Sequence, residues 1–275
     1  MAKGNKNKGK QKGESLADKA NKHLLYEASV QCVESEIDFV DETFRKIRNR
    51  DASILREDFC GTANSSCEWV RRRPTNIAYS VDIDADVQAW GSEHHVSKLS
   101  EEQQKRVNLL TADVMNSGST ANDVVLAMNF SYWIFKSREL MIQYFRSVYN
   151  SLNEDGIFIL DSFGGYEAFR EMEESTKHDG FTYIWDQSSY NPITGDGLFH
   201  IHFKFKDGSK LKQAFTYDWR VWTLPEITEM LREAGFKAEV YWEGTDEDGE
   251  GNGEFEATTT GEADAGWIAY IVATR

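Results

Sequence analysis

Residues 53–63, SILREDFCGTA, decide the fold expected for this chain. A short apolar start runs into two acids, Glu57 and Asp58, and then into small residues that precede a helical pattern from Asn64. This order is typical of a strand, a tight turn and a helix N-terminus. In an open α/β sheet, ligands bind at such a turn because backbone N–H groups and the positive end of the helix dipole converge there.

The turn lacks the sequence of the common phosphate-binding loops. A dinucleotide site has three glycines, and a P-loop has Gly-Lys followed by Ser or Thr. Here Gly61 is the only glycine and no lysine follows it. The two acids at the end of the strand disfavour phosphate and favour a cationic ligand that is rich in hydrogen-bond donors. The sequence therefore points away from NAD and ATP.

The turn resembles motif I of the class I S-adenosylmethionine (SAM) methyltransferases, in which an acid is followed by G-x-G-x-G. Glu57 takes the position of the acid, and Phe59, Gly61 and Ala63 take those of the glycines. The resemblance implies that SAM is the cofactor, and carboxylates can accept hydrogen bonds from its amino groups and ribose hydroxyls. It places the cofactor contacts at Tyr26, Glu57, Phe59, Cys60, Gly61, Asp82, Ile83, Asp113, Val114, Met128, Asn129 and Phe130.

Two further acids follow later predicted strands. Asp82 lies 25 positions after Glu57, close to one strand-helix-strand period, so it falls at the end of the neighbouring strand and on the ribose side of a ligand. An acid at this place indicates a nucleoside but not which nucleoside. Asp113 resembles the acid that accepts the adenine amine in the methyltransferase family.

The alternation of strands and helices predicts a doubly wound α/β fold. We expect a seven-stranded, mostly parallel, Rossmann-like sheet, in which residues 123–128 form a central strand. The first five strands end near residue 161, and residues 236–242 and 267–274 complete the sheet. Between strands five and six, residues 181–220 predict an antiparallel insert of three strands.

The 275 residues are enough for one large domain, which we expect over residues 15–275. Two helices, at residues 15–32 and 34–48, precede the first strand, and residues 15–50 resemble the helices that cover the cofactor in this family. Residues 1–14 are expected to be a disordered basic tail, because residues 1–13 contain five lysines and no acid.

The net charge is −15, and without the tail it is near −20, which disfavours nucleic acid as a partner. Few prolines, no long apolar run and no signal peptide predict a cytoplasmic protein that does not enter a membrane. Cys32, Cys60 and Cys67 lack metal-ligand spacing, so reduced thiols and no metal are expected. Nothing in the sequence indicates the oligomeric state.

The stretch 243–264 has nine acids and no Lys or Arg. Its residues 246–251 resemble the start of an EF-hand loop, but the bidentate glutamate required at position twelve is replaced by Ala257. We expect a mobile, solvated connection without calcium.

We interpret the chain as an enzyme that transfers a methyl group from SAM to N or O of a small molecule by in-line displacement. Aromatic residues of the insert would close a pocket for an amine, or for a small acid held by Arg220. A general base, if one is used, has as candidates Tyr132, His200, His202 and Tyr217. The predicted substrate contacts are Tyr132, Trp133, Tyr217 and Arg220.

Two alternatives remain open at this point. Residues 129–132, NFSY, have the outline of the N-P-P-Y loop with which nucleic-acid amino methyltransferases hold a flipped base, without the prolines. The two missing glycines of motif I are also compatible with a non-catalytic, SAM-binding or interaction protein. The retained acids argue against the second alternative, because a scaffold does not need carboxylates at successive strand ends.

Overall fold

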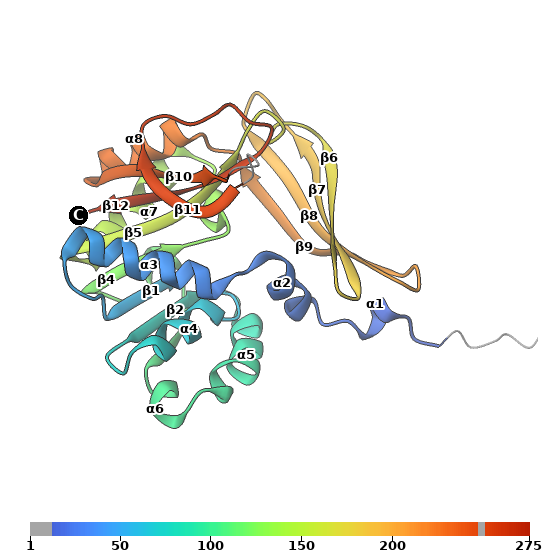
Figure 1. The fold of residues 1–275 in the computed structure, drawn as a ribbon, viewed down its shortest axis with the longest axis horizontal. Coiled ribbons are helices and arrows are strands. Elements are labelled where there is room, and N and C mark those ends of the chain that lie inside the picture. Colours follow the sequence, from blue (N-terminus) through green and yellow to red (C-terminus); the bar gives the residue numbers. More distant parts are fainter. Residues whose placement is uncertain (1–12, 247–250) are drawn as a thin grey trace, which may run out of the picture.

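The computed structural model describes residues 13–246 and 251–275, so almost all of the predicted basic tail lies outside the described residues. The chain forms an α/β body and a second, four-stranded sheet that projects from it (Figure 1). No helix in the described part of the chain is long and apolar enough to span a membrane.

The body contains an eight-stranded sheet in the order β11-β10-β12-β5-β4-β1-β2-β3. Its strands are β1 (Ile54–Asp58), β2 (Ile77–Asp82), β3 (Val107–Thr111), β4 (Asn122–Ala127), β5 (Leu152–Gly164), β10 (Lys237–Thr245), β11 (Gly251–Thr258) and β12 (Trp267–Thr274). Strands β1 to β5 pair in parallel, and β12 is antiparallel to both β5 and β10. The expected doubly wound, mostly parallel sheet is confirmed.

The helices are α1 (Leu16–Lys19), α2 (Lys22–Val30), α3 (Val33–Arg48), α4 (Asn64–Arg72), α5 (Ala85–His94), α6 (Glu101–Gln104), α7 (Arg138–Ser151) and α8 (Leu224–Ala234). Short 3-10 turns are η1 (Val96–Lys98), η2 (Val114–Asn116) and η3 (Ser131–Ile134). Every residue of β4 is buried, as expected for a central strand covered on both faces. Apolar side chains of α3 and α4 join one core cluster, and those of α7 and α8 join another.

The prediction of seven strands was one strand short. The stretch expected to be a mobile connection contains β11, which pairs antiparallel with β10 at the edge of the sheet. Its Phe255 packs against Phe39 and Tyr270, with ring centroids 6.1 and 4.6 Å apart, while the glutamates on either side are exposed. One inward aromatic residue among acids and glycines gave too weak an alternation to predict a strand. Residues 247–250 of the EF-hand-like sequence lie outside the described residues.

The second sheet has four strands, where three were predicted: β6 (Met172–His178), β7 (Phe181–Tyr190), β8 (Asp196–Phe205) and β9 (Lys210–Arg220). The additional strand is β6, whose sequence MEESTKH is mostly exposed and has no apolar alternation. The helix expected over residues 15–32 is divided into α1 and α2, and the side chain of Asn21 caps α2 by accepting from the N–H of His23.

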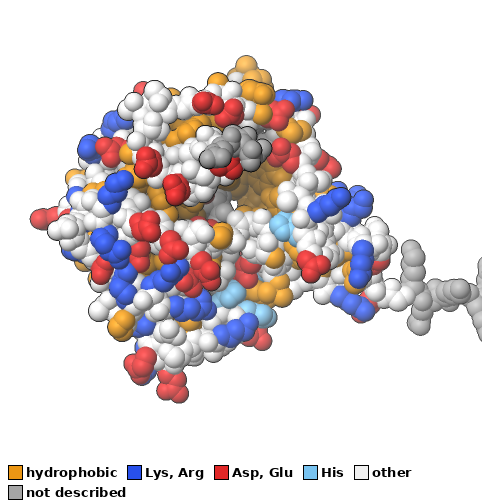
Figure 2. Space-filling model, viewed as in Figure 1, with side chains coloured by type: hydrophobic (Ala, Val, Ile, Leu, Met, Phe, Trp, Pro, Cys, Tyr) orange, Lys and Arg blue, Asp and Glu red, His pale blue; other side chains and the backbone are white. Residues whose placement is uncertain are grey.

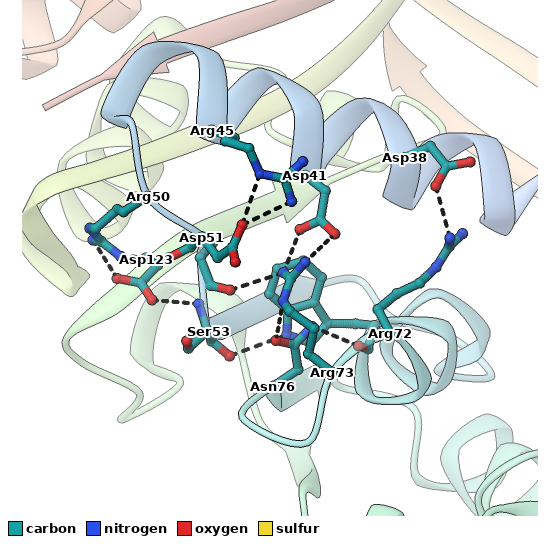
Figure 3. A network of polar contacts seen from close by, with 12 residues as sticks. Asp38, Asp41, Arg45, Arg50, Asp51, Ser53, Arg72, Arg73, Asn76 and Asp123 are labelled. Carbon is teal, nitrogen blue, oxygen red and sulfur yellow. Dashed lines mark hydrogen bonds and ion pairs between the residues drawn. The ribbon is translucent and has the colours of Figure 1, made fainter.

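A polar network fastens the amino end of β1 to its neighbours (Figure 3). The buried carboxylate of Asp123, at the start of β4, accepts from the N–H groups of Ser53 and Ile54 at 2.8 and 3.0 Å and from Arg50 at 2.9 Å. Nearby, Arg73 pairs with Asp41 and so ties the end of α4 to α3. The network sets the register of β1 beside β4, and therefore the place where β1 ends.

The substitution Asp123→Ala is expected to lower the free energy of unfolding by about 3 kcal/mol, because it leaves two strand N–H groups and the Arg50 guanidinium without their acceptor. Urea titration followed by circular dichroism measures this change. Asp155→Ala, which removes the exposed partner of Arg50, is the control and should cost less than about 1 kcal/mol.

The contribution of Asp123 should also depend on pH. Burial opposes ionisation of its carboxyl, but hydrogen bonds from Arg50 and from the Ser53 and Ile54 amides outweigh burial and hold its pKa below the usual range. A lowered pKa stabilises the fold above the unfolded value, and this contribution disappears as pH falls. The difference between wild type and Asp123→Ala should therefore shrink below about pH 4. An equal difference at pH 3 and pH 7 would contradict the role of the ionised carboxylate.

Candidate functional site

The turn after β1 has a left-handed backbone at all three positions that align with glycines of motif I. Phe59, Gly61 and Ala63, the three positions aligned with glycines, have φ values of 57°, 51° and 58°. This left-handed region is one that glycine enters readily and other residues rarely adopt. A Cβ on Gly61 would meet no atom within 4 Å, so the backbone of the turn borders open space there. The loop geometry is therefore kept although two of the glycines are missing.

The two acids at the end of β1 are already paired within the protein. Glu57 accepts from the N–H of Ser66 at 3.0 Å and from its hydroxyl, in the first turn of α4. Asp58 forms a buried ion pair with Arg56 and accepts from the Tyr144 hydroxyl at 2.8 Å. Both acids therefore have partners within the protein, and they fix the turn from opposite faces of the sheet. The contact of Glu57 with a cofactor stays a prediction.

The predicted nucleoside residues lie on one edge of the sheet. Asp82 pairs with Thr111 of β3, and its carboxylate accepts from the N–H of Gly61 at 2.8 Å and from that of Asp84 at 2.9 Å. Asp113 accepts from the N–H of Met115 at 2.9 Å. Ile83, which follows Asp82, is 76% exposed, whereas Val114, which follows Asp113, is buried. An exposed isoleucine beside an oriented carboxylate offers an apolar surface to a base and acceptors to a sugar.

Helix α2 connects this edge to the second sheet (Figure 1). Its Glu27 accepts from the Thr62 hydroxyl in the motif I turn at 2.7 Å and contacts His95 Nε2 at the same distance. On the other side, Tyr26 packs against Phe215 of β9, with ring centroids 4.9 Å apart. Helix α2 thus contacts both the motif I turn and the second sheet.

A cavity of about 780 Å³ lies between α2, the loop after β4, the end of β5 and the second sheet. Figure 2 shows a hollow between the body and the second sheet, with hydrophobic side chains in its wall and acidic side chains around it. The aromatic residues of the lining are Tyr26, Phe130, Phe163, Tyr183, Trp185, Tyr217, Trp219, Trp267 and Tyr270, and its acids are Glu36, Asp161, Glu167, Glu174 and Glu243. Of the described residues that line the cavity, none is Lys, Arg or His. Aromatic faces and carboxylates without basic residues favour a cationic ligand.

Asp161 shapes the wall of this cavity. Its carboxylate accepts from the N–H groups of Asn129 and Phe130 at 2.8 and 2.9 Å, and both of these residues have positive φ, 56° and 58°. Burial raises the pKa of Asp161 to about 7, although the two N–H donors oppose this rise. From the sequence, Asp161 was expected only to end a strand. Its position near the carboxyl end of a central strand could have identified it, because Asp82 was identified by the same kind of position on its own strand.

Several predicted residues do line the cavity, namely Tyr26, Met128, Asn129, Phe130 and Tyr217. Burial raises the pKa of Tyr217, so its hydroxyl remains protonated at neutral pH. It can donate a hydrogen bond there, but it does not suit the role of a general base.

Other predicted residues lie outside the lining, and their positions do not support the predicted roles. Tyr132 and Trp133 are fully buried in the core, where the Tyr132 hydroxyl donates to the carbonyl of Asp161 at 2.7 Å. Arg220 stacks on Trp222, with 3.7 Å from the guanidinium carbon to the ring centroid, and donates to Glu226. Among the described lining residues, the anionic acceptor that Arg220 was expected to hold therefore has no basic partner.

His200 and His202 flank Ile201, which lines the cavity, so alternation along β8 turns both histidines to the other face. His202 lies near Glu173 and Asp186 in a group that could hold a metal ion. However, His202 Nδ1 accepts from the N–H of Gln213 at 2.7 Å, so the neutral ring carries its proton on Nε2, which is 3.1 Å from Asp186. This tautomer suits a hydrogen bond to Asp186 better than a metal ligand.

No protein-family model and no curated protein match this sequence. Solved structures do match the fold. An S-adenosylmethionine-dependent methyltransferase from Clostridium acetobutylicum is 16% identical, with a TM-score of 0.69 over 91% of this chain and 96% of that chain. The fold of this chain is that of the SAM-dependent methyltransferases.

The descriptions of two further structures with this fold name the kind of molecule that is methylated. CalS10 of Micromonospora echinaspora, described as an amino pentose methyltransferase, is 17% identical, with a TM-score of 0.65 over 92% of this chain and 95% of that chain. KedS8 of a Streptoalloteichus species, described as a sugar N-methyltransferase, is 18% identical, with a TM-score of 0.63 over 100% and 98%. The matches to these structures cover between 91% and 100% of this chain.

The buried carboxyls of the site predict an unusual pH dependence of stability. Burial, opposed by the Ser66 hydrogen bonds, raises the pKa of Glu57 to about 7. Between the unfolded value of about 4.3 and the folded value, the native state binds more protons than the unfolded state, so stability falls as pH rises through this window. Glu57→Gln should flatten the decline between pH 5 and pH 8, while Glu93→Gln, at an exposed position, should not. Denaturant titrations across this range that show equal slopes for wild type and Glu57→Gln would contradict the prediction.

Proposed function

We propose that this protein is a SAM-dependent methyltransferase that acts on the nitrogen of a small-molecule amine. The observation that carries the proposal is the acidic, aromatic cavity at the carboxyl edge of β4 in a methyltransferase fold, whose lining, within residues 13–246 and 251–275, has no Lys, Arg or His. In an open α/β sheet this edge, beside the β1–β4 switch point, is where ligands bind.

The residues at the sheet edge suit SAM. Asp82 would accept the ribose hydroxyls, Ile83 and Asp113 would contact the adenine, and the turn around Gly61 would face the methionine end. The carboxylate of Asp82 is already oriented by two N–H donors, which lowers the cost of ordering it for a ligand. When bound, SAM supplies a methyl group on a positively charged sulfur, open to in-line attack by a nucleophile.

The cavity residues would orient the acceptor and move its proton. Carboxylates and aromatic faces attract the ammonium form of an amine. That form has no free electron pair, so it must lose a proton before it can act as a nucleophile. Burial raises the pKa of Glu36, in the first turn of α3, and Glu36 lines the cavity. The raised pKa makes its carboxylate a better proton acceptor, while the surrounding rings exclude water.

The descriptions of CalS10 and KedS8 as amino pentose and sugar N-methyltransferases support a small amine as the acceptor. The alternative of a nucleic-acid base clamp at residues 129–132 has less support. Tyr132 is buried, and the N–H groups of Asn129 and Phe130 donate to Asp161. The part of the cavity lining that the structure describes offers no basic side chain to a phosphate backbone.

Calorimetry tests the cofactor. The protein should bind SAM and its demethylated product, and Asp82→Ala should weaken that binding by about 1 to 3 kcal/mol, because the ribose hydroxyls lose their acceptor. Asp86→Ala, at an exposed position in the next helix, is the matched control and should leave the affinity unchanged. Saturable binding of NADH without binding of SAM would refute the cofactor assignment.

Turnover of labelled SAM tests the acceptor. Small primary and secondary amines should be methylated, and alcohols or carboxylates of the same shape should react at least about 100-fold more slowly, because the acidic cavity selects a cation. Glu36→Gln should lower kcat/KM for the amine, because the proton acceptor is lost, while SAM binding by calorimetry is retained. Methylation of RNA or DNA at 0.15 M salt with inert amines would instead identify the loop after β4 as a base clamp.

A further inference from the structure

A second cavity, of about 470 Å³, adjoins the first. Phe163, Gly164 and Trp267 line both cavities, so the same short wall separates them. The second cavity extends from this wall to the start of α8, and its volume lies within the range of about 300 to 1,000 Å³ that is usual for small-molecule sites.

The wall is held in place by two glycines at the end of β5. A Cβ on Gly164 would lie 2.2 Å from the Trp267 ring, and one on Gly165 would lie 2.3 Å from the carbonyl oxygen of Ala265. The N–H of Tyr166 donates to the carbonyl of Asp264, and that of Glu167 to the carbonyl of Ala265, at 3.2 and 2.9 Å. Glycine at both positions lets the segment before β12 lie directly against the end of β5. The boundary between the cavities is therefore a packed feature of the fold.

The second cavity is the more apolar of the two, although Glu262 and Asp264 belong to its lining. Trp222 is 2% exposed, and the part of the chain that the structure describes offers its buried indole N–H no hydrogen-bond partner. Tyr166 and Phe169, which also line the cavity, are 64% and 41% exposed. A buried N–H without an acceptor is costly, and exposed aromatic side chains next to a cavity commonly mark a binding site. These features suit an aromatic group that carries an oxygen acceptor.

We propose that the second cavity binds the aryl end of an extended acceptor, whose amine lies in the first cavity. This inference rests on the proposed function for the amine end only. The carboxylates of the first cavity hold the ammonium group, a linker passes the wall at Phe163 and Trp267, and the aryl group lies against Tyr166 and Phe169. The oxygen of that group accepts a hydrogen bond from the indole N–H of Trp222. The substrate class is thus an aryl ether or aryl ketone joined to an amine, rather than a compact amine.

Binding measurements test this without turnover. In calorimetry, 6-(4-methoxyphenoxy)hexylamine should bind wild type at least about tenfold more tightly than hexylamine, since only the first ligand reaches the second cavity. The double variant Tyr166→Ser, Phe169→Ser should lose most of this advantage and bind hexylamine as before. Ile193→Ser, which removes a 91% exposed apolar side chain from a turn of the second sheet, is the matched control and should behave as wild type.

A second variant tests the hydrogen bond. Trp222→Phe should weaken binding of the ether about fivefold and leave hexylamine unchanged, with thermal melting as the check on folding. Equal affinities of the two amines for wild type, or an unchanged advantage in the double variant, would overturn the inference. If the ether binds as expected but no amine is methylated, the second cavity stands and the proposed function fails.

Discussion

The arrangement of the site depends on one buried carboxylate. Asp161 at the end of β5 accepts both N–H groups of Asn129 and Phe130, two consecutive residues in left-handed conformation after β4. Neither residue is glycine, so the conformation persists because these hydrogen bonds compensate for its strain. The same interaction offsets part of the cost of burying the carboxyl group. The hydrogen bonds to Asp161 fix the loop after β4. This loop lies between the sheet edge and the cavity, so its conformation determines how a ligand at the edge reaches the cavity.

The two halves of the site are built from different parts of the chain. Strands β1, β2 and β3 place an oriented carboxylate and an exposed isoleucine at one edge, and the second sheet provides aromatic walls beyond β4 and β5. Helix α2 reaches both, through Glu27 to the motif I turn and through Tyr26 to β9. Burial raises the pKa values of Glu36, Glu57 and Asp161. A cation bound nearby would stabilise the ionised form of these carboxyls. A positively charged cofactor and an amine acceptor both satisfy that requirement.

Much of the fold could be predicted because strand ends are marked by local sequence. The apolar run of β4, the acid at Asp82 and the turn around Gly61 each have a signal within a few residues. The edge strands β6 and β11 could not be predicted, since their exposed faces carry charges and little alternation. The direction in which the side chains of β8 point could not be predicted either. His200 and Ile201 are neighbours in sequence, but only Ile201 lines the cavity, and which face of β8 turns inward is set by packing against the body. Asp161 was missed because its partners are backbone groups of a distant loop.

We propose that the carboxyl edge of β1 and β2 binds a nucleoside whose reactive end meets the acidic cavity. A crystal structure with S-adenosylhomocysteine is the test. We expect ribose hydroxyls on Asp82, the base against Ile83, and the sulfur directed toward the loop at Asn129 and Phe130. A ligand bound elsewhere, or bound at this edge with its sulfur pointing away from the cavity, would contradict it.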